Sequence, residues 1–493
     1  MPTDVRDHEW QNEAHSARLW SPDDNGGVIC HLSPRNCKIR DGKVGFCRVR
    51  VNRGGQLYTL NYGKSVAATE ETIETEAVYH FAPGARILSM GNIGCMMNCD
   101  YCHNWQTSQA RFVGDGSVYY YTPEQVVEEC LSRNIKIISW TYNDPVVWQE
   151  FVIDTARIAK QEGLINLYKS AFYISEPAID QLLEVIDIFS ISLKSMDPIF
   201  YKRVTKGQLP PVLDGIRQVY RSGRHLELSM LLVTDSNDMP GEPEKVSRFI
   251  LDELDDQVPL HYVRFHPDYK YTHVTRTPID RLERARAAAL EMGMKYVYLG
   301  NVYDNPAVNT YCPACGQTAV ERYGLRAVLS GLDDSARCTG CGHQVPLKMP
   351  LLGRSTTVSD EAREVLAAGT ARPFDWHGDI KALHVEVANG GKRDLTVVAV
   401  SRGGVSAGEI LRAVSLRPGS RHRFMLSKSV PDQTGVAVVA APDVQVEMYE
   451  VFDRAHFPIM STAEVNHSSD AVPQPAFIGM PFANDRPERG SRA

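Results

Sequence analysis

Three cysteines lie close together in the chain, in the order Cys95, Cys99 and Cys102. An iron–sulfur cubane normally takes four cysteine thiolates, so a group of three leaves one iron free to bind another ligand. Structural zinc also needs a fourth ligand, and His103 is the one obvious candidate nearby. The spacing therefore favours a cluster with an open iron over structural zinc or three reduced core cysteines.

The cysteine motif follows a short apolar segment at residues 86–90, which predicts a buried strand. Strand-like and helical segments then alternate to about residue 300, which predicts parallel pairing, with the site at the carboxyl ends of the strands. The expected fold class is α/β, a partial barrel of about six βα units. The other predicted strands cover residues 135–141, 165–169, 188–194, 226–233, 260–266 and 295–299, and the predicted helices include 212–222 and 279–292.

Capping residues mark the starts of two helices. Thr122 and Gln125, with a proline after the threonine, form the pattern of a capping box. The apolar face that follows includes Cys130, which is therefore predicted to be a core residue and not a fourth cluster ligand. Asp144 and Pro145 give the same start signal after the next predicted strand.

The spacing of Cys95, Cys99 and Cys102, with the aromatic Tyr101 before the last cysteine, resembles the signature of the radical S-adenosylmethionine (SAM) superfamily. The resemblance implies a 4Fe-4S cluster whose open iron is chelated by the amino and carboxylate groups of SAM. The reduced cluster would cleave SAM to a 5′-deoxyadenosyl radical, which abstracts hydrogen from a substrate. The resemblance also implies that Tyr101 lies against the adenine and that a donor such as flavodoxin or ferredoxin supplies the electron.

From about residue 17 to 345 the chain resembles, more narrowly, the radical SAM member of the AmmeMemoRadiSam group, itself similar to pyruvate formate-lyase activating enzymes. Several short sequence motifs agree in the same order. Substrates in this group are largely uncharacterised, so the resemblance implies the opening step of the reaction and leaves its target unassigned. The matching motifs lie at residues 91–95, 102–109, 141–145, 264–270, 296–301 and 309–315.

The same resemblance implies a set of SAM contacts. Asn143 and Asp144 lie in a segment that helps to hold the methionyl amino group. Lys194 corresponds to a lysine that contacts the SAM carboxylate, and His266 to a histidine near SAM. Each position also has a structural interpretation: Asp144 as a helix cap, Lys194 as a solvated strand end, and His266 as a hydrogen-bonded core group. Ser192 stands where the activating enzymes carry an acid, which weakens the transfer of that partner function.

Two Cys-x2-Cys knuckles form a second metal signal, at Cys312, Cys315, Cys338 and Cys341. Paired knuckles close a tetrahedral thiolate site with no open position, so we expect structural zinc in a ribbon over residues 306–350. Zinc contributes on the order of 10 kcal/mol to the folding of such a module. The alternative is an electron-relay cluster, and a nucleic-acid-binding ribbon is less favoured because few basic residues lie beside it.

Cys30, Cys37 and Cys47 form a third group, before the predicted barrel. The relatives carry a C-x-x-C-P-x-x-C pattern here, and Ser33 replaces the second cysteine. Three interpretations stay open: zinc bound together with His31, an open second cluster, or reduced remnants of a lost site. We assign no auxiliary cluster to this group.

The sequence changes character after about residue 370, where segments become alternating or β-branched, with Gly, Pro, Asn and Asp between them. They predict a small antiparallel β sandwich, with packing as its simplest role. Its predicted strands cover residues 379–388, 395–401, 422–426, 435–441 and 444–451. The expected domain plan is an N-terminal extension at 1–83, the barrel at 84–305, the zinc ribbon at 306–350, the β domain at 370–452 and an irregular tail at 453–493, with an apolar clip at 477–482.

The chain has 493 residues and a net charge of −7, with both signs interspersed. This length predicts two or three domains, and the charge gives no general basic footprint for nucleic acid or an anionic membrane. No run of about 18 apolar residues predicts a membrane span and no signal peptide is evident, so a cytoplasmic location is expected. The eleven cysteines, mostly closely spaced, indicate metal in a reducing compartment.

The sequence therefore predicts an oxygen-sensitive radical SAM enzyme with an unidentified substrate, a small molecule in preference to a protein. Two enzymatic alternatives are transfer of a 3-amino-3-carboxypropyl radical to an acceptor and glycyl-radical activation of a protein partner. The competing class is a non-enzymatic, redox-sensing metal scaffold. It is motivated by Ser33, by Ser192, and by Ser170 and Ala171 at a turn where relatives usually have Asn-Gly.

Overall fold

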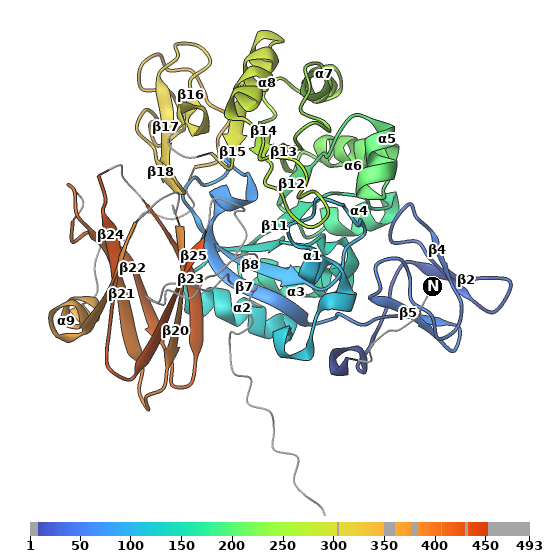
Figure 1. Cartoon of the computed structure of the whole chain (residues 1–493), viewed down its shortest axis with the longest axis horizontal. Helices are drawn as coiled ribbons and strands as arrows, with labels where there is room; N and C mark the ends of the chain where they lie inside the picture. Colours follow the sequence, from blue (N-terminus) through green and yellow to red (C-terminus); the bar gives the residue numbers. More distant parts are fainter. Residues whose placement is uncertain are drawn as a thin grey trace, which may run out of the picture.

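The computed structural model describes residues 8–302, 305–349, 360–376, 382–405, 407–428 and 432–451. An α/β core lies at the centre, with a small N-terminal module on one side and a β-rich C-terminal unit on the other (Figure 1). The tail predicted at residues 453–493 and its apolar clip at 477–482 lie outside the described residues.

Seven parallel strands form the core sheet, in the spatial order β15, β14, β13, β12, β11, β10 and β8. They coincide with the seven strands predicted from the sequence, and the predicted α/β class is confirmed. Each apolar segment is buried between the outer helices and the interior of the sheet. The strands are β8 (Arg86–Asn92), β10 (Ile137–Thr141), β11 (Ile165–Ser170), β12 (Ile188–Ser192), β13 (His225–Leu232), β14 (Leu260–Arg264) and β15 (Val297–Gly300).

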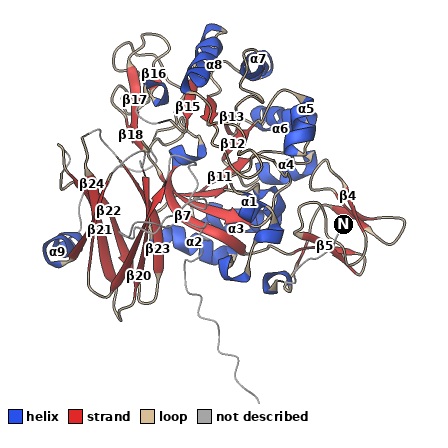
Figure 2. Ribbon diagram, viewed as in Figure 1, coloured by secondary structure: helices blue, strands red, loops and turns tan. Residues whose placement is uncertain are grey.

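Helices connect successive strands and cover the outside of this sheet (Figure 2). Each buries an apolar stripe, as α3 does with Phe151, Val152 and Ala156. The helices are α2 (Pro123–Ser132), α3 (Gln149–Gln161), α4 (Glu176–Leu183), α6 (Leu209–Arg221), α7 (Glu242–Glu253) and α8 (Ile279–Glu291), with α1 (Trp105–Ser108) and α5 (Pro198–Phe200) as short turns.

The predicted helix caps are present. Thr122 accepts a hydrogen bond from the backbone N–H of Gln125 at 3.2 Å, and its own N–H donates to Gln125 Oε1 at 2.8 Å, which completes the capping box. Asp144 Oδ1 accepts from the N–H of Val146 at 3.3 Å and caps the 3₁₀ turn η5 (Pro145–Trp148). Cys130 is fully buried on α2, in agreement with its predicted place in the core.

Two strands end earlier than predicted. β12 ends at Ser192 and β14 at Arg264, so Lys194 and His266 lie in the loops that follow. The chain leaves the ladder at Lys194 because its N–H donates to the Tyr201 hydroxyl and its carbonyl accepts from Asn237 Nδ2. Both side chains thus lie beyond the sheet's carboxyl edge.

The sequence analysis missed one strand of the core. β7 (Lys64–Thr72) pairs antiparallel with β8, and its residues are almost all buried although many are polar. Thr69, Glu70 and Glu71 give it no apolar alternation, so the usual strand signal is absent. The 3₁₀ turn η2 (Ile73–Glu76) follows and packs Ile73 under the parallel strands.

Small sheets form the N-terminal module and the four-cysteine module after the core. The short strands β3 and β4 pair antiparallel and place Cys30 directly opposite Cys37. The N-terminal strands are β1 (His15–Ser16), β2 (Trp20–Pro22), β3 (Val28–Cys30), β4 (Cys37–Ile39), β5 (Arg50–Arg53) and β6 (Gln56–Thr59), and those after the core are β16 (Thr310–Tyr311), β17 (Thr318–Tyr323) and β18 (Arg326–Val328). β9 (Tyr119–Tyr120) extends the edge of β7.

The C-terminal unit has two antiparallel layers that share an apolar core, including Val385, Val397, Phe424 and Val438. One layer joins the central sheet, because β23 pairs with β7 at Phe424 and Glu70. The five strands predicted here are present, and the structure adds β19, β22 and α9. The elements are α9 (Asp360–Ala368), β19 (Thr370–Asp375), β20 (Ala382–Asn389), β21 (Leu395–Arg402), β22 (Ile410–Leu416), β23 (Arg421–Ser427), β24 (Gly435–Ala440) and β25 (Val444–Val451).

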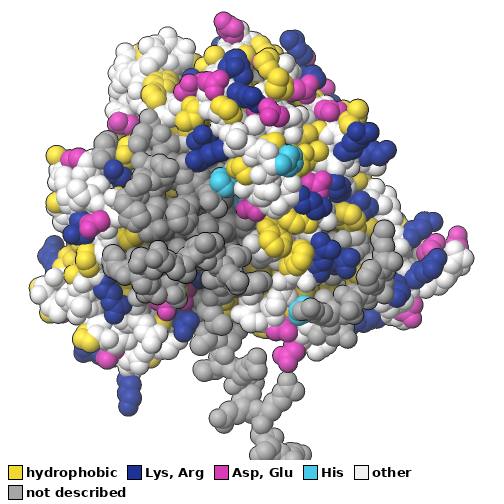
Figure 3. Space-filling model, in the orientation of Figure 1, with side chains coloured by type: hydrophobic (Ala, Val, Ile, Leu, Met, Phe, Trp, Pro, Cys, Tyr) yellow, Lys and Arg dark blue, Asp and Glu magenta, His cyan; other side chains and the backbone are white. Residues whose placement is uncertain are grey.

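On the face drawn in Figure 3, the basic and acidic side chains of the described residues are interspersed. No helix in the described part of the chain is both long and apolar enough to cross a membrane.

The buried carboxylate of Glu70 on β7 forms ion pairs and a hydrogen bond that link the C-terminal unit to the core. Glu70 lies 2.5 Å from Arg86 Nε, 2.6 Å from Arg412 and 2.9 Å from His422 Nε2. Burial alone would raise the pKa of Glu70, but Arg412, His422 and Arg86 hold it well below its usual value. The ionised carboxylate is therefore the shared counter-ion of two guanidinium groups at this interface.

We expect Glu70→Gln to destabilise the C-terminal unit by about 3 kcal/mol, because it leaves two partly buried guanidinium groups without their counter-charge. Amide hydrogen exchange in β23 should accelerate about 100-fold. Glu128→Gln is the matched control: Glu128 pairs with Arg417 at 3.2 Å across the same interface, but both groups are exposed. That exposed pair should contribute less than about 1 kcal/mol. Equal effects of the two substitutions would contradict the prediction.

The stability of the C-terminal unit should also fall in mild acid. Burial lowers the pKa of His384 to about 3 and that of His422 to about 4, against about 6.5 in the unfolded chain. The unfolded state therefore takes up protons that the folded state excludes as the pH falls below 6.5, and stability decreases by on the order of 1–2 kcal/mol per histidine by about pH 5. Calorimetric melting against pH measures this loss. His384→Phe should reduce the pH dependence, because neither nitrogen of His384 has a hydrogen-bond partner among the described residues.

Candidate active site

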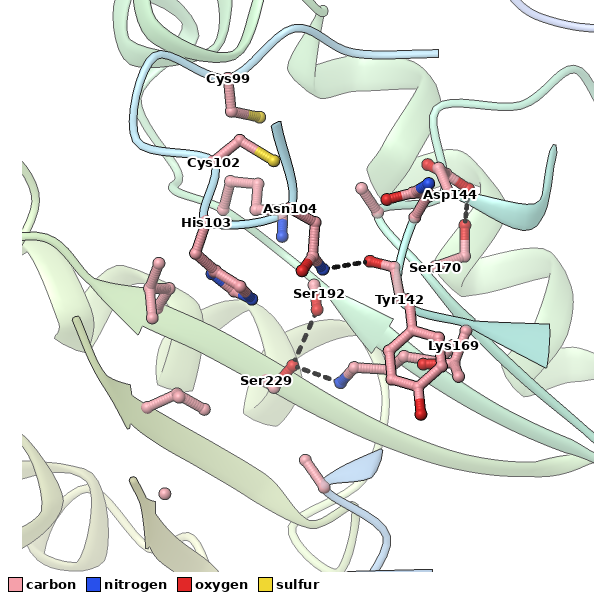
Figure 4. A pocket seen from close by; sticks show the side chains of 18 of the residues that line it. Cys99, Cys102, His103, Asn104, Tyr142, Asp144, Lys169, Ser170, Ser192 and Ser229 are labelled. Atoms are coloured by element: carbon pink, nitrogen blue, oxygen red, sulfur yellow. Dashed lines mark hydrogen bonds between the residues drawn. The ribbon is translucent and has the colours of Figure 1, made fainter. Parts of the chain in front are cut away.

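A cavity opens at the carboxyl ends of the parallel strands (Figure 4). Its wall is formed by the cysteine loop after β8 and by residues at the ends of β10, β11, β12 and β13. The residues predicted from the sequence that line it are Cys95, Cys99, Cys102, Tyr101, Asn143, Asp144 and Lys194. His266 lies two residues beyond β14, is half-buried, and is not among the lining residues, so its role near SAM stays a prediction.

The cysteine loop packs tightly against the N-terminal module. Gly94 has a φ of +91°, and a Cβ at this position would lie 3.1 Å from the Cys47 carbonyl oxygen, so the approach requires glycine. Burial raises the pKa of the Cys99 thiol to about 12, and the Lys194 ammonium opposes that rise. Burial also raises the pKa of Cys95, with Asp144 adding to the effect. A metal ion would remove this cost, because it deprotonates a coordinating thiol outright.

The segment after β10 is held in place by side-chain hydrogen bonds. Asn143 donates from Nδ2 to the Asn92 carbonyl at 2.5 Å and accepts from the Thr107 hydroxyl at 3.0 Å. The Tyr142 carbonyl accepts from Asn104 Nδ2 at 2.7 Å, and Tyr142 adopts a φ of +65°. These contacts fix the chain that carries Asp144 against the cysteine loop.

Asp144 has one oxygen committed and one available. Oδ1 accepts from the Ser170 hydroxyl at 2.7 Å and from the N–H of Val146, whereas buried Oδ2 has no hydrogen-bond partner among the described residues. Burial raises the pKa of Asp144, and the hydroxyl of Ser170 opposes the rise. The serine at the turn where relatives usually have Asn-Gly therefore orients this carboxylate.

Lys194 reaches the cavity from the loop after β12. Its ammonium lies close enough to Cys99, Cys102 and Asp144 to oppose the rise that burial causes in the pKa of each. Within the described part of the chain it makes no ion pair, although its backbone is fixed at both N–H and C=O. The cavity thus presents a cation beside the cysteine loop.

These groups fit SAM and an iron–sulfur cluster. Three thiols line one cavity, the free oxygen of Asp144 can accept from the amino group of SAM, and the Lys194 ammonium can pair with its carboxylate. Buried Tyr101 packs its ring 6.1 Å from the rings of both Phe200 and Tyr271 and adds an aromatic wall.

Sequence reasoning missed a second lysine in the cavity. Lys169 on β11 donates from Nζ to the Ser190 hydroxyl at 3.0 Å. It also donates to the Ser229 hydroxyl at 3.1 Å (Figure 4). Ser192 Oγ lies 3.1 Å from Ser229 Oγ and continues this hydroxyl row. The sequence did contain a signal for Lys169. It lies on the same strand face as Leu167, and a charged residue on the inward face of a buried strand is unusual and indicates a functional role.

The four knuckle cysteines come together as predicted. Cys312, Cys315, Cys338 and Cys341 place their Sγ atoms within 4.8 Å of one another, with Cys312 and Cys341 3.6 Å apart and Cys315 and Cys338 also 3.6 Å apart. Such a group can bind a metal ion with four thiolates. The identification of that metal as zinc stays a prediction.

The N-terminal cysteines also approach one another. Cys30 and Cys37 face each other on β3 and β4, and both Cys30 and Cys37 add to the rise that burial causes in the pKa of Cys47, to about 11. The neighbouring His31 bonds to Ser21 and Asn36 through its two ring nitrogens. The three interpretations of this group stay open.

Comparison with known proteins agrees with this site. The family described as "Radical SAM superfamily" matches residues 92–246, the span that contains the cysteine loop and Lys194. An uncharacterised protein of Methanocaldococcus jannaschii is 39% identical over 326 residues, which are 66% of this chain and 96% of that protein. The chain belongs to the radical SAM superfamily. It is thus an enzyme of the class that uses SAM and a 4Fe-4S cluster.

More distant relatives cover part of the chain. The pyruvate formate-lyase 1-activating enzyme of Escherichia coli K12 is 22% identical over 44% of this chain and 93% of its own length. A radical SAM methyltransferase structure from Sphaerobacter thermophilus has a TM-score of 0.36 and 16% identity, covering 48% of this chain and 71% of that one.

Proposed function

We propose that this radical SAM enzyme reductively cleaves SAM at a 4Fe-4S cluster held by Cys95, Cys99 and Cys102, and abstracts hydrogen from a small-molecule substrate. With the cluster bound, one electron breaks the bond between sulfur and the 5′ carbon of SAM and gives methionine and a 5′-deoxyadenosyl radical. The chain's own residues bind and orient SAM and keep water away from the cavity.

The observation that carries the proposal is that Asp144 and Lys194 both line the cavity beside the cysteine loop. Among the described residues, Asp144 Oδ2 has no hydrogen-bond partner and the Lys194 ammonium forms no ion pair. The two groups match the amino and carboxylate groups of one amino acid. Asn143 would hold the Asp144 segment, and Tyr101 would provide the wall for the adenine. We keep His266 as a SAM neighbour in the proposal, supported by the resemblance alone.

Two other reactions remain alternatives for the same site. Cleavage of the other C–S bond would transfer a 3-amino-3-carboxypropyl group to an acceptor. The likeness to pyruvate formate-lyase activating enzymes favours glycyl-radical activation of a protein. We place the enzyme in the cytoplasm, where a flavodoxin or ferredoxin would supply the electron and reducing conditions would preserve the cluster.

Anaerobic reconstitution with iron and sulfide, followed by dithionite and SAM, tests the proposal. Mass spectrometry should find 5′-deoxyadenosine and methionine. Methylthioadenosine in their place would establish the 3-amino-3-carboxypropyl alternative. If a fully reduced, cluster-loaded sample gave no cleavage product, the proposal would be overturned in favour of the redox-sensing scaffold.

Lys194→Met should weaken SAM binding about 10- to 100-fold while the cluster still assembles, because the substitution removes one charge-assisted contact and no thiolate. Equilibrium dialysis with labelled SAM measures the affinity, and the iron content reports the cluster. Lys270→Met is a matched control, since Lys270 is an exposed lysine that pairs with Asp100 of the cysteine loop at 2.9 Å and lies outside the cavity wall. Unchanged SAM affinity in Lys194→Met would refute the assigned contact.

A further inference from the structure

The interior of the sheet changes from apolar to polar along the strands. At the closed end, Ile87, Ile137, Leu167 and Ile188 pack with Ile73 of the η2 turn in one apolar cluster. Two residues further along the same faces lie, in the same order, Ser89, Ser139, Lys169 and Ser190. The apolar cluster closes the bottom of the space, and the polar residues above it face the cavity.

Lys169 is the positively charged residue of this polar layer, and its side chain lines the cavity. Its ammonium has three hydrogens, and two of them are directed to the neutral hydroxyls of Ser190 and Ser229. Burial, together with the positive charge of Lys194, lowers the pKa of Lys169 to about 8. A buried ammonium held by hydroxyls alone is costly and calls for a counter-ion.

The nearest carboxylates are committed to other groups. Glu76 accepts from Ser139 at 2.9 Å and from Thr141 at 2.8 Å. Glu227 accepts from His261 at 2.7 Å, from His225 at 2.9 Å and from the backbone N–H groups of Tyr79 and His80. Their negative charge raises the pKa of Lys169, but within the described residues neither carboxylate forms an ion pair with it.

Two ammonium groups therefore share one cavity, and the SAM carboxylate can neutralise one of them. Lys194 lies beside the cysteine loop, whereas Lys169 lies on β11 next to the hydroxyl row of Ser190, Ser192 and Ser229. Glu76 and Glu227 stabilise the Lys169 ammonium only at a distance, so a carboxylate from a second molecule can pair with it directly. The carboxylates of Glu76 and Glu227 would repel a dianion, so the charge balance favours a single negative charge.

We propose that Lys169, with the hydroxyls of Ser192 and Ser229, binds a carboxylate of the substrate, so that the substrate is a small monoanionic carboxylic acid. The inference deepens the proposed function and rests on it. The carboxylate would fix one end of the substrate over the polar layer, and the rest would extend towards the cysteine loop, where hydrogen is abstracted. The row of serines is compatible with a compact ligand, because the small side chains leave the ammonium accessible from the cavity.

Acetate is the probe, because a site that recognises the carboxylate of a larger acid through Lys169 also admits a carboxylate this small. Saturation-transfer NMR on the SAM-loaded, unreduced holoenzyme should detect acetate at millimolar concentration and should not detect acetamide, its neutral isostere. Lys169→Met should lower acetate affinity at least about tenfold, the loss expected for one charge-assisted hydrogen bond. Lys295→Met, which removes a partly exposed lysine paired with Asp256 at 3.9 Å, should leave acetate binding unchanged.

SAM affinity is measured on the same samples and should be retained in Lys169→Met. If Lys169→Met does not fold, Lys169→Gln is the second variant, since its amide can still contact both serines. Equal binding of acetate and acetamide, no acetate binding, or acetate binding unaffected by loss of Lys169 would each overturn the proposal. Loss of SAM binding in the variant would assign Lys169 to SAM instead, and tighter binding of phosphate than acetate would exclude a monoanion site. Acetate binding needs no SAM cleavage, so failure of the proposed function is observed separately.

Discussion

Cys99→Ala should abolish the 4Fe-4S cluster and reduce SAM cleavage at least about 1,000-fold, equivalent to about 4 kcal/mol of transition-state stabilisation. Among the described residues, three thiols line the cavity. Loss of Cys99 leaves two, which cannot hold a cubane that already lacks a fourth protein ligand. The cavity should persist, because the cysteine loop is also fixed by backbone contacts such as Asp100 N–H to the Val204 carbonyl. Iron and sulfide content, the visible absorption of the cluster and the yield of 5′-deoxyadenosine measure the result.

Cys130→Ala is the matched control, because it also removes one buried thiol, but from the outer helix α2. It should retain iron and SAM cleavage and cost only the small packing loss of one sulfur atom. The four-cysteine group at residues 312–341 should keep its metal in both variants. Full cleavage activity in Cys99→Ala would show that the motif is not the catalytic cluster site.

The parallel strands and the position of the cysteine loop could be predicted because their signals are local. Apolar segments bounded by glycine and helix caps, such as Thr122 with Gln125, depend on neighbours in sequence. Sites in such folds lie where the carboxyl ends of the parallel strands meet. This predicts that Asp144, Lys194 and Cys99 line the same cavity, although they are far apart in the chain. The structure agrees with that juxtaposition.

The elements that could not be predicted depend on long-range contacts between polar groups. β7 is buried with Glu70 and Glu71 because Arg86, Arg412, Ser89 and Tyr142 satisfy their carboxylates, and all of these partners are distant in sequence. The sequence of β7 lacks the hydrophobic alternation from which a strand is normally predicted. The C-terminal strands were predictable one by one, but their junction with β7 was not.

Lys169 illustrates the same limit at the site. The sequence places Lys169 in a strand, and the alternation of side chains along a strand predicts which face it lies on. Its functional role, however, depends on its hydrogen bonds to Ser190 and Ser229 of two other strands. Only the three-dimensional structure shows that its ammonium meets hydroxyls and no carboxylate within ion-pair distance among the described residues. The functional interpretation of this charge therefore comes from the fold and not from a motif.

Removal of the metal from the four-cysteine group should unfold the module that follows the core. The Sγ atoms lie as close as 3.6 Å to one another, and a metal ion in such a site contributes on the order of 10 kcal/mol to folding. Cys338→Ser should release the metal and make amides of residues 310–345 exchange at least about 100-fold faster. His343→Ala is the matched control. His343 is exposed and lies two residues after Cys341, but it is not one of the four cysteines that could bind the metal. Elemental analysis should find one zinc in the control and none in Cys338→Ser, and iron in place of zinc would establish the electron-relay alternative.

The effect of this metal should extend to the cavity. Arg322 on β17 is buried, donates to the Tyr79 carbonyl at 2.8 Å and lies 3.6 Å from Glu74, and both of these partners line the cavity. Unfolding of the module therefore removes the counter-charge of Glu74 and loosens the segment beneath Lys169. We expect Cys338→Ser to weaken acetate binding while the cluster at Cys95, Cys99 and Cys102 still assembles, since residues 310–345 supply none of the three thiols in the cavity wall. Protected amides at 310–345 in the metal-free variant would instead show that the module folds on its apolar contacts alone.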